Sequence, residues 1–156
     1  MWEYNNSAIY ISNKKNPINN EYFIWASDQI IARARFANHL FIDGTFHHPI
    51  NFAQLLIIIF KDVISSEYIP GFYILMSNKT EIIYDMIFKS FKNILTQNGI
   101  YNLNIKTKTT DTELALINAV NNNFVDFKRI GCWFLLKQDL LREAKVLGLL
   151  NKKTII

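Results

Sequence analysis

Hydrophobic and polar positions change their spacing along this chain, and each change of period marks a change of secondary structure. The first regular stretch repeats every three to four residues, which predicts a short helix that Ser27 or Asp28 can cap. Its buried face carries Ile30, Ile31, Ala34 and Ala37. The period then shortens, and three strands are predicted over residues 40–46, 53–60 and 69–76. The middle strand is so continuously aliphatic that we expect both of its faces to be covered.

The second half of the chain alternates helices with strands. Thr80 can cap a long helix over residues 81–97, and Asn98-Gly99 ends it. The periodicity then predicts a strand over 103–109, a helix over 112–122, a strand over 127–134 and a last helix from about 135 to 147, stopped at Gly148. This order is typical of an α/β fold in which a three-strand antiparallel meander feeds parallel strands that cross over through helices.

Composition fits a single soluble domain. Half of the 156 residues are hydrophobic and 14% are aromatic, enough to bury roughly two thirds of the unfolded surface in one core. The formal charge of +4 permits nucleic-acid binding without requiring it. Cys132 is the only cysteine, which excludes a disulfide framework within one chain and favours a reducing, intracellular setting. The N-terminus shows no signal-peptide pattern, and the longest aliphatic run, residues 55–60, is too short to cross a bilayer, so we expect no membrane association.

Two aspartates carry most of the functional information. Asp43 follows the apolar run 40–42, and Asp111 follows the segment 106–110. Asp43 thus lies within the predicted strand 40–46, where its apolar run ends, and Asp111 lies just beyond the predicted strand 103–109. Ligands in α/β sheets gather where strand ends converge. Two carboxylates side by side offer the hard oxygen ligands that a divalent cation prefers, whereas without a metal their repulsion would raise one pKa. The pair therefore suggests a metal site for phosphoryl transfer on nucleic acid.

Four blocks of sequence surround these acids in a fixed order. They are Phe-Ile-Asp-Gly-Thr-Phe at 41–46, Pro-Gly-Phe-Tyr-Ile-Leu-Met-Ser-Asn-Lys-Thr-Glu at 70–81, Thr-Asp-Thr-Glu-Leu-Ala-Leu-Ile-Asn-Ala-Val at 110–120 and Gly-Cys-Trp-Phe at 131–134. Together they resemble the transposase domain of Mutator-like elements, the MULE family, over about residues 23–149. The resemblance implies an RNase H-like mixed sheet flanked by helices and truncated before its C-terminal part. We then expect residues 1–22 to form an arm or loop and residues 150–156 a tail.

The resemblance also implies chemistry at DNA ends. Members of this family use an Asp, Asp, Glu triad to hold two divalent ions, Mg²⁺ or Mn²⁺, which activate a water or a 3′ hydroxyl. Asp43 matches the first acid and Asp111 the second, so both become candidate catalytic residues and metal ligands. By the same resemblance, the partner is DNA at transposon ends, the chain can assemble as a homo-oligomer, and its location is nuclear or otherwise intracellular.

Two departures from the family pattern bear on activity. The third acid of the family, a Glu, lies beyond a helical insertion after the last strand, and the sequence ends at Ile156 before such an insertion is completed. Neither Asp139 nor Glu143 is assigned to that role. The family's Cys-x-x-His has Leu135 in place of the histidine. We interpret the chain as a transposase-derived fragment that is incomplete or inactive, with a non-catalytic module that binds DNA or another protein as the alternative.

Each acid also has a purely structural alternative. Asp43-Gly44 is a common turn dipeptide and could form a hairpin turn. Thr110 and Glu113 fit a helix capping box, so Asp111 could belong to a helix start without any chemistry. The joint occurrence of both acids with the flanking blocks favours the metal site.

The histidines and the cysteine are weaker candidates for chemistry. His47 and His48 follow the first acid, but adjacent residues of a strand point to opposite faces and cannot both reach one ion without a bend. His39 is a less favoured candidate for a metal ligand than either of them. Cys132 is expected to pack as a small buried residue.

Basic residues suggest a track for phosphate groups. Lys106 and Lys108 share one face of a strand that leads to Asp111, which makes them candidate nucleic-acid contacts. Further candidates for such a track are Arg33 and Arg35, expected to point outward from the first helix, and Lys128 and Arg129. The alternative for all of them is an ordinary solvated strand edge.

Overall fold

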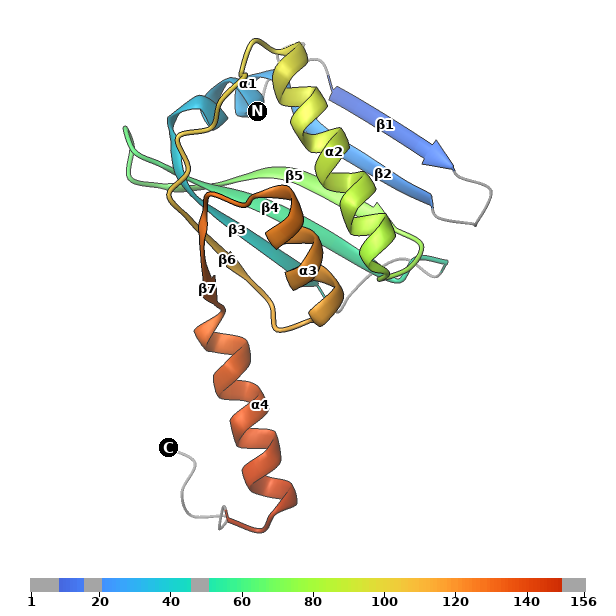
Figure 1. Cartoon of the computed structure of the whole chain (residues 1–156), viewed down its shortest axis with the longest axis vertical. Coiled ribbons are helices and arrows are strands. Elements are labelled where there is room, and N and C mark those ends of the chain that lie inside the picture. The colour runs from blue at the N-terminus through green and yellow to red at the C-terminus, as the bar shows by residue number, and fades with distance from the viewer. Residues whose placement is uncertain (1–8, 16–20, 46–50, 150–156) are drawn as a thin grey trace, which may run out of the picture.

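The computed structural model describes residues 9–15, 21–45 and 51–149, which form one seven-stranded mixed sheet in the order β1-β2-β5-β4-β3-β6-β7 (Figure 1). The strands are β1 (Ile9–Lys15), β2 (Glu21–Ser27), β3 (Ala37–Thr45), β4 (Gln54–Asp62), β5 (Tyr68–Met76), β6 (Thr107–Thr110) and β7 (Lys128–Gly131). The helices are α1 (Asp28–Arg33), the short 3₁₀ helix η1 (Ala34–Phe36), α2 (Glu81–Gln97), α3 (Leu114–Asn123) and α4 (Trp133–Val146).

The sheet joins an antiparallel part to a parallel part. β3, β4 and β5 pair in antiparallel order along the chain, which confirms the predicted meander. β6 runs parallel to β3, and β7 runs parallel to β6. The chain reaches β6 through α2 and β7 through α3, so the predicted α/β order with helical crossovers is confirmed as well.

An antiparallel hairpin adds two strands that the periodicity did not predict. β2 pairs with β5, and β1 pairs with β2 at the edge of the sheet. The arm or loop expected over residues 1–22 is therefore wrong for Ile9–Lys15. A strand at an edge needs backbone hydrogen bonds along one side only, so its content of Asn, Ser and Lys did not prevent it from pairing. β2 alternates the buried residues Tyr22, Ile24 and Ala26 with half-buried neighbours.

The first helix is shorter than predicted. Ser27 caps it as expected, since its hydroxyl accepts a hydrogen bond from the N–H of Ile30 (3.4 Å). The helix ends at Arg33, and after η1 the chain enters β3 at Ala37, which was expected on the helix. Arg33 does not point freely outward, because its Nε donates to the buried carboxylate of Asp62 (2.6 Å) at the end of β4. This ion pair ties the helix to the sheet.

α2 has the predicted bounds and, together with α3, covers one face of the sheet (Figure 1). Gly99 follows its end with a φ of 73°, in the left-handed region that favours glycine. The core between these helices and the sheet is rich in aromatic rings, namely Phe60, Phe72, Phe88, Phe91 and Phe124. This packed face gives the strands a rigid backing.

The opposite face of the sheet is more open, so the expectation that β4 is covered on both faces is wrong for the described residues. The residues of β4 alternate between buried and half-buried positions along its whole length. The half-buried positions include Leu55, Ile57 and Ile59. Asp43 of β3 belongs to the open face, because its neighbours Ile42 and Gly44 are buried on the other side.

The last elements differ from their predicted bounds. β6 begins only at Thr107, and β7 ends at Gly131 because α4 starts almost immediately afterwards. α4 runs away from the sheet (Figure 1) and stops before Gly148, whose φ of 69° fits its predicted role as a helix stop. The tail expected over residues 150–156 lies outside the described residues. In the part of the chain that the structure describes, no helix combines the length and the apolar character needed to cross a membrane.

Candidate functional site

The candidate site lies where two parallel strands end side by side. The last pair in the register of β3 with β6 joins Ile42 to Thr110. Asp43 is the next residue of β3, and Asp111 is the first residue after β6. Since neighbouring strands lie about 4.8 Å apart, the register brings the two predicted site residues to the same end of the sheet as neighbours.

Both aspartates line one open pocket of about 360 Å³. The remaining wall includes Phe41, Ile59, Tyr68, Thr109, Thr110 and Cys132. The rings of Phe41 and Tyr68 meet edge to face, with centroids 5.2 Å apart. Asp43 is exposed and Asp111 is half-buried, so a solute can reach both carboxylates.

The two carboxylates influence each other electrostatically. Partial burial raises the pKa of Asp43 above its usual range, and the negative charge of Asp111 raises it further. The backbone N–H of Gly44 opposes this shift, because a hydrogen bond to the carboxylate favours its charged form. The pKa of Asp43 is therefore raised overall, with burial as the larger cause and the charge of Asp111 as the smaller one.

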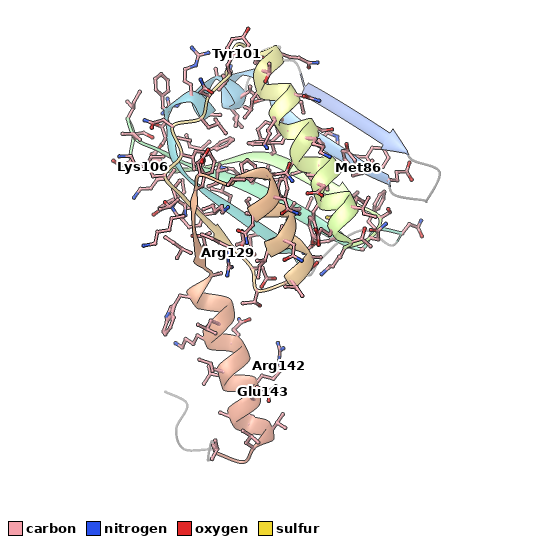
Figure 2. The ribbon with its side chains drawn as sticks, in the orientation of Figure 1. Met86, Tyr101, Lys106, Arg129, Arg142 and Glu143 are labelled. Atoms are coloured by element: carbon pink, nitrogen blue, oxygen red, sulfur yellow. The ribbon has the colours of Figure 1, made fainter. Side chains whose placement is uncertain are left out.

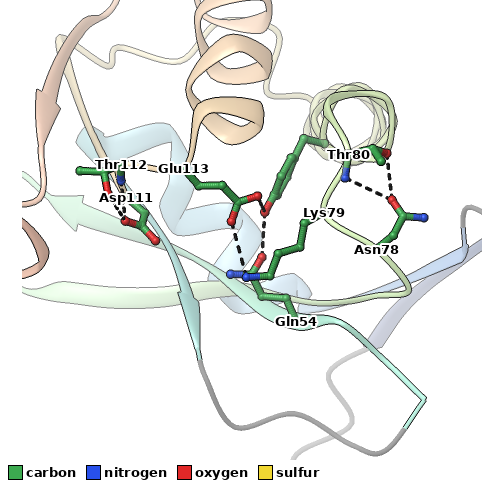
Figure 3. Close-up of polar contacts among 8 residues, drawn as sticks. Gln54, Asn78, Lys79, Thr80, Asp111, Thr112 and Glu113 are labelled. Atoms are coloured by element: carbon green, nitrogen blue, oxygen red, sulfur yellow. Dashed lines mark hydrogen bonds and ion pairs between the residues drawn. The ribbon is translucent and has the colours of Figure 1, made fainter. Parts of the chain in front are cut away.

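Asp111 is held by the turn that it begins. Its Oδ1 accepts hydrogen bonds from the backbone N–H and from the hydroxyl of Thr112 (Figure 3). α3 starts only at Leu114, and Glu113, the residue at its cap, makes no side-chain capping bond. Thr110 is the last residue of β6. The capping-box alternative for Asp111 is therefore wrong.

The turn alternative for Asp43 is also wrong. Gly44 continues β3 and pairs with Leu56 of β4. A Cβ at Gly44 would lie 1.5 Å from Nε2 of Gln54, so a side chain there is incompatible with the position of the Gln54 amide. Glycine is needed at this position for the close approach of a side chain rather than for a turn.

Three polar side chains, Gln54, Tyr84 and Glu113, form what we term the polar bridge (Figure 3). The hydroxyl of Tyr84 lies 2.8 Å from Oε1 of Gln54 and 3.0 Å from Oε1 of Glu113. Gln54 and Tyr84 are buried, and Nζ of Lys79 lies 3.5 Å from Oε2 of Glu113. Burial and the negative charge of Glu113 raise the pKa of Tyr84 far above its usual range, so its hydroxyl keeps its proton and can donate it.

Sequence reasoning missed the polar bridge. Its three members lie on β4, α2 and the turn before α3, and no local pattern connects them. One signal was present, because Tyr84 lies three residues before Ile87 and seven before Phe91, on the face of α2 predicted to be buried. A buried tyrosine hydroxyl requires a hydrogen-bond partner, so Tyr84 itself indicates a polar residue on a neighbouring element.

The predicted phosphate track forms only in part. Lys108 is 1% exposed, and its Nζ donates to the carbonyl oxygens of Val120 (3.3 Å) and Phe124 (2.7 Å) at the end of α3. The expectation that Lys108 contacts nucleic acid is therefore wrong, because its ammonium group satisfies helix carbonyls inside the protein. Lys106 and Arg129 are exposed (Figure 2), and their contact with phosphate stays a prediction.

Among the described residues, no histidine or cysteine joins the two aspartates as a metal ligand. The ring nitrogens of His39 contact the hydroxyls of Thr107 and Thr109, the latter at 2.8 Å. Burial and the positive charge of Lys61 lower the pKa of His39. Cys132 is half-buried and lines the pocket instead of being fully buried as expected. His47 and His48 lie outside the described residues.

No third acid joins the pair within the described part of the chain. There, no group of three or more His, Cys, Asp or Glu side chains is arranged to hold a metal ion. Glu143 is exposed on α4, which carries it away from the sheet (Figure 2). Leu135 and Asp139 belong to α4 as well, and their side chains are outside the described ones.

The fold and the position of the two acids define the class of protein. A mixed sheet flanked by helices, with one acid on β3 and the other directly after the parallel strand β6, is an α/β fold consistent with an RNase H-like arrangement. The family model of the MULE transposase domain matches residues 39–139, a range that includes both aspartates. The chain belongs to the MULE transposase domain family and is a transposase-derived domain. No curated protein matches the chain.

The residues present fit the divalent metal that the family implies. Asp43 and Asp111 offer four oxygen atoms of the hard type that Mg²⁺ and Mn²⁺ prefer. The pocket that they line is open, so water can complete the coordination shell. A cation would also relieve the repulsion that raises the pKa of Asp43.

Proposed function

We propose that this domain binds Mg²⁺ or Mn²⁺ through Asp43 and Asp111 and presents the metal to DNA for phosphoryl transfer. The observation that carries the proposal is the meeting of the two carboxylates at the ends of β3 and β6, in one open pocket. Membership of a transposase family supports DNA as the substrate. The region matched by the family model contains both aspartates, which supports their role in that function.

The chain's own contribution to this chemistry is positional. Divalent ions, when bound, supply a Lewis acid that activates a water or a 3′ hydroxyl and stabilises the leaving oxygen. Asp43 is held on a strand with a hydrogen bond from the N–H of Gly44, and Asp111 is held by Thr112. Both carboxylates thus present oxygen atoms on fixed backbone, which reduces the reorganisation that binding requires. Because a ligating carboxylate must be ionised, metal affinity should fall in acid.

We propose that DNA approaches along the β6–β7 side of the sheet. Lys106, Lys128 and Arg129 are exposed there, and Nη1 of Arg129 donates to Oγ1 of Thr110 (3.3 Å), the residue before Asp111. Cations at these positions can contact phosphate groups, and the resulting affinity should fall steeply with salt. Fluorescence anisotropy with a labelled duplex measures this, and Lys106→Ala should reduce both the affinity and the salt slope. Equal slopes for both proteins would remove Lys106 from the interface.

We further propose that this chain alone does not complete strand cleavage. The described residues supply two acids, whereas the family chemistry uses three. The same observation favours the second candidate function, a non-catalytic module that holds DNA or another transposase-derived chain. A nuclear location and self-association are also proposals from the family, and imaging of tagged protein and size-exclusion chromatography test them.

Calorimetric titration with Mn²⁺ tests the metal site. Wild type should bind, and Asp43→Asn and Asp111→Asn should each lose binding because each removes an anionic ligand. Asp126→Asn is the matched control, since Asp126 is exposed in the turn before β7, apart from the pocket. Unchanged affinity in both site variants would refute the proposed metal site.

A plasmid-nicking assay tests whether the two acids suffice for strand cleavage. No nicking is expected from the purified chain in Mg²⁺ or Mn²⁺. Metal-dependent nicking that disappears in Asp43→Asn would show that two acids suffice, and the non-catalytic alternative would then be wrong.

A further inference from the structure

The geometry points to the polar bridge of Gln54, Tyr84 and Glu113 as a device that sets the separation of Asp43 and Asp111. We infer that Tyr84 is a positioning residue for the metal site, although it does not line the pocket. This inference rests on the proposed function and adds to it the residues that hold the two ligands in register.

One end of the polar bridge contacts β3, the strand that carries Asp43. Gln54 is the first residue of β4, and its amide packs so closely against Gly44 that a Cβ there would lie 1.5 Å from Nε2. Gly44 directly follows Asp43, and successive residues of a strand point to opposite faces. Gln54 therefore supports β3 from the core side, immediately behind the exposed carboxylate.

The other end of the polar bridge, Glu113, belongs to the turn that carries Asp111. Glu113 lies two residues after Asp111 and is the cap residue of α3. Only Thr112 separates them, and it donates both its N–H and its hydroxyl to Oδ1 of Asp111. Because Glu113 is held by Tyr84 and by Lys79, a displacement of its carboxylate would shift the turn that orients Asp111.

Tyr84 connects these two ends from α2, an element that carries neither acid. Its hydroxyl has one proton, so it donates to one of the two facing oxygens at a time, and the ionised carboxylate of Glu113 is the stronger acceptor. Tyr84 and Gln54 are both buried, so water is excluded from the contact between them, whereas Glu113 is half-buried. A phenylalanine ring would fill the same space, and what tyrosine adds is the link between β4 and the turn before α3.

Tyr84→Phe tests this role against a matched control, Tyr22→Phe. Tyr22 is also fully buried, and its hydroxyl lies 2.7 Å from Oγ of Ser90, likewise a residue of α2. Each variant removes one buried hydroxyl, so both should lose similar stability in urea unfolding. Only Tyr84→Phe should weaken Mn²⁺ binding, by roughly tenfold, which is the usual effect of losing a group that orients a metal ligand. Equal Mn²⁺ affinities in the two variants would overturn the inference.

Glu113 provides a second test that does not alter the core. Glu113→Gln and Glu113→Ala both remove a negative charge near the pair, but only glutamine keeps an oxygen that accepts from Tyr84. Glu113→Gln should bind Mn²⁺ several times more tightly than Glu113→Ala, and adding Tyr84→Phe to Glu113→Ala should cause little further loss. Equal affinities for the two Glu113 variants would count against the bridge.

Asp43→Asn distinguishes failure of the inference from failure of the proposed function. If it abolishes Mn²⁺ binding while Tyr84→Phe behaves like Tyr22→Phe, the metal site stands and the bridge has no positioning role. If Asp43→Asn and Asp111→Asn both leave Mn²⁺ affinity unchanged, the metal site is refuted and the inference falls with it.

Discussion

Without metal, a variant that lacks one carboxylate of the pair should be more stable than wild type. In the presence of metal, wild type should be the more stable of the two proteins. The perturbation is Asp43→Asn, which keeps the shape of the side chain and removes its charge. We expect this change in stability because Asp43 lies beside Asp111 at the ends of neighbouring strands and because the pKa of Asp43 is raised. The difference in unfolding free energy between the variant and wild type should change sign when metal is added, which is a stronger test than a change in its magnitude.

The magnitude follows from the spacing of the strands. Two unit charges about 5 Å apart repel by about 0.8 kcal/mol in water and by about 3 kcal/mol at the effective dielectric constant near a protein surface. Because Asp43 is exposed, solvent screening favours the lower figure, and we expect the variant to gain about 1 kcal/mol without metal. At a free Mn²⁺ concentration ten times the Kd, binding adds about 1.4 kcal/mol to wild type alone, which more than offsets that gain.

The stability difference between Asp43→Asn and wild type should depend on pH in one direction. The folded-state pKa of Asp43 is raised, so ionising the pair costs stability above the unfolded-state pKa. This cost disappears as pH falls below the ordinary value of 3.8, where the carboxyl is protonated in both states. The stability advantage of Asp43→Asn should therefore be present near neutral pH and vanish in acid.

Urea unfolding followed by circular dichroism measures these differences, with and without Mn²⁺. Asp126→Asn serves as the control, because it removes an exposed carboxylate away from the pocket. A variant that is less stable than wild type without metal at neutral pH would refute the reasoning from repulsion. An advantage that persists unchanged in saturating Mn²⁺ would refute the metal site.

Three further predictions concern stability and use the same unfolding assay. Lys108→Met should cost about 1–3 kcal/mol, because the carbonyl oxygens of Val120 and Phe124 lose a buried donor, and an unchanged midpoint would contradict this. Gly44→Ala should cost about 1–3 kcal/mol, since the Gln54 amide must move, and fully additive losses in the double variant with Gln54→Ala would argue against that contact. Burial alone would raise the pKa of Asp62, yet hydrogen bonds from the N–H of Ile64 and from Arg33 hold it below its usual range. Its stabilising effect is present above the unfolded-state pKa and is lost as pH falls through the folded-state value, so the deficit of Asp62→Asn should shrink in acid, and a constant deficit would show the reasoning to be wrong.

The sequence was sufficient for those parts of the fold that depend on local periodicity. The meander and α2 follow from the change between two-residue and helical spacing, and each lies close to its predicted bounds. The adjacency of Asp43 and Asp111 followed from strand order, because acids at the same end of neighbouring parallel strands must meet. The resemblance to the MULE family, now confirmed by the match over residues 39–139, supplied that order.

Local pattern could not supply what depends on distant partners. β1 ends in the polar run Ser12–Lys15, and it is a strand because β2 offers it a free edge. Lys106 and Lys108 were predicted to share one strand face, but Lys106 precedes β6 and is exposed, whereas Lys108 is buried. Only the position of α3 decides that the ammonium group of Lys108 meets helix carbonyls. The contacts of Tyr84 are of the same kind, because they join residues about 30 positions away on either side.

The outer edge of β7 limits how copies of this domain can associate. The strand has only four residues, all exposed, and two of them are Lys128 and Arg129. So short an edge offers few backbone groups to an incoming strand, and its paired positive charges repel an identical edge. A sheet rich in isoleucine and phenylalanine is thereby protected from growth by strand addition at that side.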